Sequence, residues 1–228
     1  MFFNQLAVHF IRHFSMITEL SHPNLQFHFT EAIHGAGALL PEELPLMSGF
    51  ARERVASFCA GRYCARKCLS RYGYTDFPVL MKPSGAPLWP DGFTGSISHS
   101  KSLAGAIVAR KCDFLSVGLD IEEAGRLQPD VWPLLFTRAE QAFLHQQADQ
   151  PHIATIFFSI KEAFYKLRSA FASGFVDFTD VEVTKDGNAY SIRSLNGAEC
   201  FLDSGASFPA FISNFGANVV SYLAVSAG

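Results

Sequence analysis

Two acidic residues stand at alternate positions of the short stretch 118–122, GLDIE, as Asp120 and Glu122. If this stretch is a strand, successive side chains point to opposite faces, so the two carboxylates share one face. Carboxylates this close repel each other unless a cation or a basic partner lies between them. The pair is therefore either the solvent-facing end of a strand or two ligands of a divalent metal ion.

A second group with chemical potential lies in the stretch 158–166, FSIKEAFYK. Glu162 and Lys166 are one helical turn apart, and the apolar residues of this segment fall on the opposite face of the predicted helix. One interpretation is an exposed salt bridge, which contributes little to stability. The other is a pair at an internal seam, which we favour because so apolar a helix is covered on both lateral faces.

Small hydroxyl residues and a histidine end a predicted strand in the stretch 95–100, GSISHS. A serine nucleophile with His99 as its base is rejected, because neighbouring side chains on a strand diverge and no acidic residue is placed to orient the imidazole. Hydroxyl, imidazole and backbone N–H groups at a strand end suit anion binding, which would involve Ser98 and His99. The alternative for His99 is a histidine whose hydrogen bonds are satisfied within its loop.

Basic residues collect on a predicted helix over 48–72 and in the loop after it. Arg62 and Arg66 are one turn apart, Arg54 lies about 12 Å before Arg62 along the helix axis, and Lys82 follows in a loop rich in proline and glycine. Such a set can hold two separated phosphates. A solvated helix face has the same composition, so both interpretations stay open at this point.

The elements that must position these residues form two similar series. The first contains the helix Ser48–Tyr72 and the strands Phe93–Ser98, Leu103–Ala109 and Phe114–Ile121, of which the second is largely apolar and therefore central. The second begins with a capping box at Thr137–Glu140 and continues with a long helix, His152–Phe171, and strands over 178–184, 189–192, 199–202 and 218–225. This order predicts an α+β fold, repeated in two halves.

The composition is that of a folded protein, with 228 residues of which 49% are hydrophobic and 17% charged. A net charge of −3 excludes a polycationic nucleic-acid binder, and 23 phenylalanines exclude a disordered chain. Residues 1–112 hold 11 basic against 7 acidic side chains, whereas residues 113–228 hold 7 against 14. This asymmetry suggests a basic half that binds phosphates and an acidic half that binds a cation, or merely two differently charged surfaces.

The amino-terminal segment and the cysteines bear on location. The apolar start lacks a basic leader and is interrupted by Asn4, His9 and Arg12, so we expect neither a signal peptide nor a membrane span. The five cysteines include no CxxC pair. Cys64 and Cys68 are one helical turn apart without a second ligand pair, so buried helix residues explain them better than a metal site does. Reduced thiols and a cytoplasmic protein are therefore expected.

Together and in this order, the motifs resemble those of the 4′-phosphopantetheinyl transferases of the Sfp/enterobactin-synthesis type. The matching stretches are RYCAR at 62–66, GAPLWPDG at 85–92, GSISH at 95–99, VGLDIE at 117–122 and FSIKEAFYK at 158–166. The most specific part is the GxDxE strand followed about forty residues later by the (F/W)SxKExxxK helix. The resemblance spans roughly residues 54–180.

The resemblance implies an architecture and a reaction. The fold would be an α+β, pseudo-twofold monomer of two similar halves, 1–112 and 113–228, each a long helix packed on a small, mainly antiparallel sheet. Coenzyme A would lie in the cleft between the halves. The enzyme would transfer the 4′-phosphopantetheine group to a serine of an apo acyl or peptidyl carrier protein, with Mg²⁺, and release adenosine 3′,5′-bisphosphate.

The resemblance also assigns roles to residues of this chain. The metal would be held by Asp120, Glu122 and Glu162, and the catalytic residues would be Asp120, Glu162 and Lys166, with Lys166 on the phosphate that is transferred. Coenzyme A would also be contacted by Arg54, Arg62, the loop Lys82, Pro83, Ser84 and Gly85, the pair Ser98 and His99 at the adenosine 3′-phosphate, and Val176 at the pantetheine side.

The implied chemistry agrees with these residue types. Negative charge builds on the pyrophosphate bridge as the acceptor hydroxyl attacks, and an oxygen-liganded cation together with Lys166 would stabilise it. Glu162 could deprotonate the serine directly or through a bound water. Oxygen ligands suit Mn²⁺ as well as Mg²⁺.

Two other functions fit the same residues: a Mg²⁺-dependent phosphoryl or pyrophosphate hydrolase that uses Asp120 and Glu122, and a non-catalytic carrier- or nucleotide-binding module. The sequence does not specify whether the carrier belongs to siderophore or other nonribosomal peptide synthesis, polyketide synthesis or fatty-acid synthesis. Ala86 stands where some relatives have lysine in the GxP turn, and residues 1–45 match nothing in the family.

Overall fold

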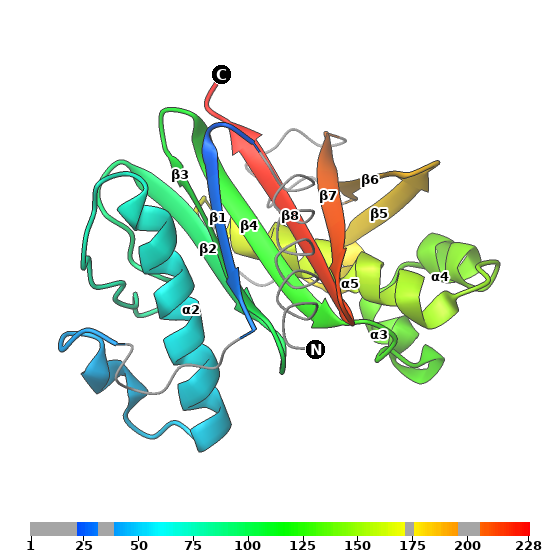
Figure 1. Ribbon diagram of the computed structural model, residues 1–228. Helices are drawn as coiled ribbons and strands as arrows, with labels where there is room; N and C mark the ends of the chain where they lie inside the picture. The colour runs from blue at the N-terminus through cyan, green and yellow to red at the C-terminus, as the bar shows by residue number, and fades with distance from the viewer. Residues whose placement is uncertain (1–21, 32–38, 172–175, 196–205) are drawn as a thin grey trace, which may run out of the picture.

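The computed structural model describes residues 22–31, 39–171, 176–195 and 206–228 of the chain. Two antiparallel sheets form its centre, and the long helices α2 (Arg52–Ser70) and α5 (Gln150–Arg168) pack on them from opposite sides (Figure 1). The first sheet has the order β1-β3-β2, with β1 Leu25–Thr30, β2 Phe93–His99 and β3 Ala104–Arg110. The second has the order β4-β8-β7-β6-β5, with β4 Phe114–Glu123, β5 Val181–Asp186, β6 Ala189–Ser194, β7 Ser207–Phe215 and β8 Asn218–Ser226. Shorter helices are η2 Leu44–Met47, η3 Pro129–Val131, α3 Trp132–Leu135, α4 Arg138–Leu144 and η4 Phe178–Asp180.

Three apolar clusters hold these layers together. One joins α2 to the first sheet, a second joins the facing sides of the two sheets, and the third joins α5 to the second sheet and to α3 and α4. Strand β3 contributes to two of them, because Ala106 faces α2 while its neighbour Ile107 faces β4. Both faces of β3 are therefore buried. Strand β3 is also the central strand of the first sheet, as its apolar composition predicts.

The expected α+β class is confirmed, with a long helix on an antiparallel sheet in each half, although one sheet has three strands and the other has five. The chain passes from the first sheet to the second at the turn between β3 and β4, so residue 112 stays our proposed division between the halves. The capping box at Thr137 is present. The helix predicted over 48–72 begins at Arg52, and the helix predicted over 152–171 ends at Arg168.

One predicted strand begins later than expected, and two strands were not expected. The strand predicted from 178 begins at Val181, because Asp177 and Asp180 cap each other's backbone N–H groups in the 3-10 turn η4. Strands β1 and β7 were not predicted. The strand predicted over 199–202 lies outside the described residues.

The cysteines of α2 are core residues, as expected. Cys64 and Cys68 are fully buried, and their Sγ atoms lie 3.6 Å from the Ala104 carbonyl and 3.5 Å from the Ala106 carbonyl. Burial raises the pKa of the Cys64 thiol to about 12, so the free thiol is protonated at neutral pH.

Helix α5 lies directly on β4 because the residues of β4 that face it are small or polar. Ser116 donates a hydrogen bond from Oγ to the Leu167 carbonyl over 2.8 Å. At Gly118 an added Cβ would stand 1.9 Å from the Ala163 carbonyl oxygen, so only glycine permits this approach. Asp120 and Glu122 continue the same face of β4, and the close contact therefore sets their distance from α5.

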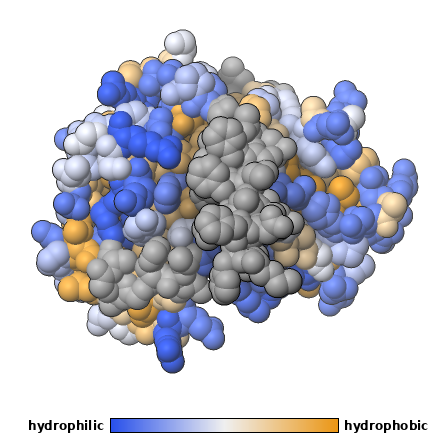
Figure 2. Space-filling view, in the orientation of Figure 1, coloured by the Kyte–Doolittle hydropathy of each residue, from blue (hydrophilic) through white to orange (hydrophobic). Residues whose placement is uncertain are grey.

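On the face shown in Figure 2, hydrophilic side chains predominate over the described surface and apolar ones form separate patches. Among the described residues, no helix has both the length and the apolar character needed to cross a bilayer.

Candidate active site

The site lies at the seam where β2 and β4 meet the carboxyl-terminal part of α5. Lys166 donates hydrogen bonds from Nζ to Asp120 Oδ1 over 2.7 Å and to Ser98 Oγ over 2.9 Å. Ser98 Oγ also lies 3.1 Å from Asp120 Oδ1 and accepts the backbone N–H of Ile121 at 3.2 Å. One residue from each of three elements thus forms a compact polar knot, in which the Asp120 side chain is 4% exposed.

This arrangement decides between the two interpretations of Glu162 and Lys166. The ion pair that Lys166 makes is with Asp120 on β4, and its side chain is 31% exposed. Lys166 therefore lies at an internal seam, as we favoured, and its partner is a carboxylate far away in the sequence.

The predicted acidic residues influence one another electrostatically. Burial and the neighbouring Asp120 carboxylate raise the pKa of Glu122 to about 7, and the Glu162 carboxylate adds to this effect. Burial, followed by Asp120, also raises the pKa of Glu162. Three carboxylates from β4 and α5 therefore share one region, where the Lys166 ammonium offsets only part of their charge.

The donor set fits a hard divalent cation in its chemistry. Asp120 Oδ2 is buried and has no hydrogen-bond partner, although buried carboxylate oxygens are normally paired. Carboxylate oxygens are the ligands that Mg²⁺ and Mn²⁺ prefer. In the conformation described, no group of three or more His, Cys, Asp or Glu side chains within residues 22–31, 39–171, 176–195 and 206–228 is gathered closely enough to hold a metal ion. The metal role of Asp120, Glu122 and Glu162 therefore stays a proposal.

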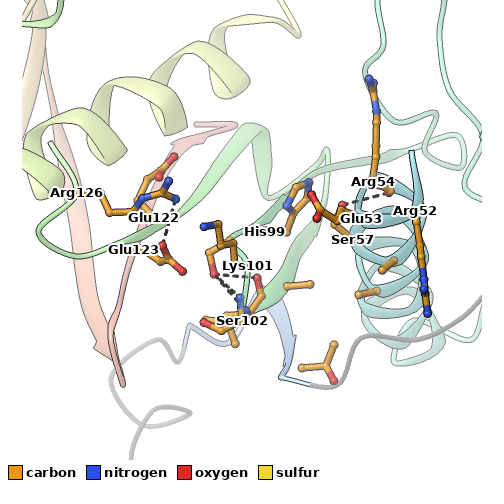
Figure 3. A pocket seen from close by; sticks show the side chains of 16 residues that line it. Arg52, Glu53, Arg54, Ser57, His99, Lys101, Ser102, Glu122, Glu123 and Arg126 are labelled. Carbon is orange, nitrogen blue, oxygen red and sulfur yellow. Dashed lines mark hydrogen bonds and ion pairs between the residues drawn. The ribbon is translucent and has the colours of Figure 1, made fainter. Parts of the chain in front are cut away.

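The larger cavity beside the knot has a volume of about 1110 Å³ and lies between the two halves (Figure 3). It is lined by Arg54 of α2, His99 at the end of β2 and Glu122 of β4, three of the predicted residues. Partial burial, followed by the charge of Lys166, lowers the pKa of His99. Its walls also contain three basic residues that the sequence did not single out, namely Arg52, Lys101 and Arg126. Each side of the cavity carries both charges, because Glu53 lies beside Arg52 and Arg54 on α2, and Arg126 is paired with Glu123 on the opposite side.

A smaller cavity of about 430 Å³ is lined by four more of the predicted contacts. Lys82, Ser84 and Gly85 line it on one side and Lys166 lines it on another, whereas Pro83 of the same turn does not line it. The turn is closed by a hydrogen bond from the Lys82 N–H to the Ala86 carbonyl over 2.8 Å, and Gly85 has the positive φ of +86° that the turn needs. Lys166 therefore belongs both to the knot and to the wall of this cavity.

Two predicted contacts, Arg62 and Val176, lie away from these two cavities. Arg62 is buried, donates from Nε to the Val79 carbonyl over 2.7 Å and stacks over the Phe58 ring, and burial lowers its pKa to about 10. Val176 packs against the core cluster of α5. Contacts of Arg62 and Val176 with coenzyme A stay predictions. Arg66, considered as a phosphate clamp, is instead bound to the buried Glu43 carboxylate.

Sequence reasoning also missed a buried ion pair next to the site. Lys161 is fully buried and donates from Nζ to Glu140 Oε2 over 2.7 Å and to the carbonyls of Leu135 and Phe178. Glu140 in turn accepts the N–H of Val183. This network ties α4 and the segment before β5 to α5, one residue before Glu162. Its only sequence signal is a lysine on the apolar side of a helix, which indicates a buried partner.

We expect Glu122→Gln to stabilise the protein above pH 7 in metal-free buffer. Because the pKa of Glu122 is raised from 4.5 to about 7, the folded state keeps a proton that the unfolded state loses between these values, so stability falls as pH rises through this window. Glutamine removes the repulsion, which should raise the melting temperature at pH 8 by about 2–6 °C, with no difference below pH 4.5. Thermal unfolding with a chelator present measures both.

Glu123→Gln is the matched control, since Glu123 makes an outer ion pair with Arg126 at 3.1 Å and its loss should change the melting temperature little. A Glu122→Gln variant that is no more stable than the wild type at pH 8 would show that the charge of Glu122 does not destabilise the folded state.

Comparison with known proteins agrees with the motifs and with the site. Residues 42–109 match the family model of the 4′-phosphopantetheinyl transferase N-terminal domain, and residues 116–212 match that of the 4′-phosphopantetheinyl transferase superfamily. The chain is 34% identical over 165 residues to the 4′-phosphopantetheinyl transferase Svp of Streptomyces mobaraensis, covering 71% of this chain and 67% of that protein. It is 34% identical over 146 residues to the 4′-phosphopantetheinyl transferase PptT of Mycobacterium tuberculosis, covering 64% of each. It is 30% identical over 164 residues to enterobactin synthase component D of Salmonella typhi, covering 71% of this chain and 64% of that protein.

The chain therefore belongs to the 4′-phosphopantetheinyl transferase superfamily, and the resemblance inferred from its motifs is confirmed. Both halves take part in the match, because the first model covers α2, β2 and most of β3 and the second covers most of β4 and all of α5. The residues of the knot come from both matched regions.

Proposed function

We propose that this enzyme transfers the 4′-phosphopantetheine group of coenzyme A to a serine of an apo carrier protein and releases adenosine 3′,5′-bisphosphate. The observation that supports this most is the knot of Lys166, Asp120 and Ser98 beside two cavities whose walls contain cationic side chains. A lysine that is paired with a buried carboxylate and also lines a cavity is well placed to stabilise the phosphate whose bond to the leaving group breaks during transfer.

The two cavities offer binding groups for the nucleotide part of coenzyme A. Arg54 and His99 line the larger cavity, and Lys82 lines the smaller one with Ser84 and Gly85. Cationic side chains bind phosphates by charge-assisted hydrogen bonds. We propose that they hold the adenosine phosphates while Lys166 orients the phosphate next to pantetheine.

Glu162 is our candidate for the general base. Its pKa is raised by burial and by the Asp120 carboxylate, and a carboxylate with a raised pKa accepts a proton more readily near neutral pH. The proton of the acceptor serine would pass to Glu162, directly or through a water molecule. Asp120, Glu122 and Glu162 would hold Mg²⁺ or Mn²⁺, which when bound neutralises charge on the pyrophosphate bridge.

Glu162→Gln is expected to reduce transfer by about 100-fold or more and, in metal-free buffer, to leave the affinity for coenzyme A within about threefold of the wild-type value. The amide keeps the shape of the side chain but accepts no proton. Single-turnover transfer and a separate coenzyme A titration measure the two quantities. Near-full transfer by this variant would remove Glu162 from the mechanism.

The decisive experiment incubates the protein with coenzyme A, Mg²⁺ and an apo carrier protein, followed by mass spectrometry. A carrier that gains one phosphopantetheine supports the transferase. Release of free phosphopantetheine would indicate a hydrolase, and no product would indicate a binding module. A peptidyl carrier domain from siderophore synthesis is the first to test, because one relative is named as an enterobactin synthase component, followed by polyketide and fatty-acid carriers.

We further propose a cytoplasmic monomer. Cys59, Cys64, Cys68 and Cys112 are free thiols, which fits a reducing compartment. Light scattering of the purified protein tests the oligomeric state.

A further inference from the structure

Asn218 joins the two sheets at the edge of the larger cavity. It is the first residue of β8, where it pairs with Glu123 of β4 on one side and with Phe215 of β7 on the other. The residue is 5% exposed, and its Nδ2 donates to the Phe215 carbonyl over 3.2 Å. Its backbone therefore belongs to the second sheet, beside the strand that carries Asp120 and Glu122.

The rest of the Asn218 side chain binds the first sheet. Its Oδ1 accepts hydrogen bonds from Ser100 Oγ at 2.6 Å and from Ser102 Oγ at 3.4 Å, and Nδ2 lies 3.1 Å from Ser102 Oγ. Both serines belong to the turn between β2 and β3. The buried amide of Asn218 thus connects the β2–β3 turn of the first sheet to strand β8 of the second sheet.

Ser100 organises the turn that Asn218 binds. Its Oγ accepts the backbone N–H groups of Ser102 at 3.2 Å and Leu103 at 3.1 Å while it donates to Asn218. The hydroxyl proton has two acceptors within reach, and Asn218 Oδ1 at 2.6 Å is much closer than the Leu103 carbonyl at 3.5 Å, so Ser100 donates chiefly to Asn218. The conformation of the turn is therefore coupled to the position of Asn218.

The turn also carries two side chains of the larger cavity. His99 precedes Ser100 and Lys101 follows it, and both line the cavity between Arg54 of α2 and Glu122 of β4 (Figure 3). Neither Lys101 nor Asn218 was singled out by the sequence. A shift of the turn would move the His99 and Lys101 side chains relative to Glu122 on β4.

We infer that Asn218 is a positioning residue for coenzyme A: through Ser100 and Ser102 it fixes the turn that presents His99 and Lys101 to the phosphates of the nucleotide. This inference rests on the proposed function, since it requires that coenzyme A binds in the larger cavity. The inference adds Asn218 to the determinants of affinity, although the hydrogen bonds of its side chain go to Ser100, Ser102 and the Phe215 carbonyl and to no predicted contact of coenzyme A.

The test compares the binding of coenzyme A and of 3′-dephospho-coenzyme A by isothermal titration calorimetry, without a carrier protein. For Asn218→Ala we expect the dissociation constant of coenzyme A to rise about 10-fold, as the loss of one or two well-formed hydrogen bonds allows, and that of the dephospho compound to rise less than twofold. Ser100→Ala should give the same pattern. The double variant should be no weaker than either single one, because both substitutions remove the same link.

Asn214→Ala is the matched control, because Asn214 is an exposed asparagine of the same β7–β8 hairpin and should leave both affinities unchanged. Thermal unfolding accompanies each titration, and if Asn218→Ala does not fold, Ser100→Ala takes its place. An equal loss for both compounds, or no loss, would overturn the positioning role alone. A wild-type protein that binds neither compound would overturn the role and the proposed function together.

Discussion

Asp120→Asn is expected to lower the rate of transfer by about 10³-fold or more with the fold intact. Asp120 is the carboxylate that pairs with Lys166 at 2.7 Å, and its buried Oδ2 has no partner and is free to bind a cation. Asparagine preserves the volume of the side chain but removes the negative charge that both interactions require. Because electrostatic contributions of this kind account for several kcal/mol of a reaction barrier, the loss should appear in kcat. Single-turnover transfer to an apo carrier measures it.

The fold should tolerate this change better than the chemistry does. The Asp120 charge raises the pKa values of both Glu122 and Glu162, so its removal relieves repulsion while it leaves Lys166 without its carboxylate. We expect these effects to offset each other and the melting temperature to change by less than about 4 °C. Asp113→Asn, the same substitution in the turn before β4, is the control. An Asp120→Asn variant with more than a tenth of wild-type activity would exclude the proposed role.

Local patterns predicted the parts of the site that lie on a single element. The alternation of β4 placed Asp120 and Glu122 on one face, and the helical spacing of α5 placed Glu162 and Lys166 on its polar side. What those patterns could not give was the partner of Lys166, because an exposed i,i+4 pair and a buried pair to another strand have the same local sequence. The contact with Asp120 follows from the packing of α5 on β4, which no helical or strand period encodes.

The two buried residues that were missed, Asn218 and Lys161, share one property, namely a polar side chain whose partner is distant in the chain. Asn218 binds Ser100, and Lys161 binds Glu140. Their burial is tolerated because both side chains are paired. Arg66 was misjudged for the same reason, since its partner Glu43 precedes α2 by several residues.

The two missed strands have different causes. The segment of β1, LQFHFT, alternates between apolar and polar residues, so its pattern was present and was overlooked. Strand β7 contains Pro209, which usually argues against a strand. Pro209 pairs with β6, whereas the pairing of β7 with β8 begins only at Phe211, so the missing N–H falls where β7 has a neighbour on one side only.

Gly118→Ala is expected to lower both stability and activity. The new Cβ would stand 1.9 Å from the Ala163 carbonyl oxygen and 2.8 Å from the Leu167 nitrogen, so the backbone of α5 must move away from β4. Shortening a side chain elsewhere cannot relieve a clash with backbone atoms. We expect a loss of about 3 kcal/mol of stability, which corresponds to a fall of about 6–12 °C in melting temperature. Thermal unfolding checks this value.

The same displacement reaches the chemistry, because α5 carries Glu162 and Lys166 while β4 carries Asp120. A shift of about 1 Å between catalytic groups can cost about 100-fold in rate, and we expect a loss of that size at a temperature where the variant is fully folded. Gly61→Ala is the comparison variant: its Cβ would meet the Ile97 Cγ2 methyl at 2.7 Å, so it also costs stability, but it leaves α5 on β4 in place and should keep the wild-type kcat. If Gly118→Ala lost stability but kept the wild-type kcat, the close packing of α5 on β4 would contribute to folding alone. If the variant lost neither stability nor activity, the packing between Gly118 and Ala163 would be less close than the structure shows.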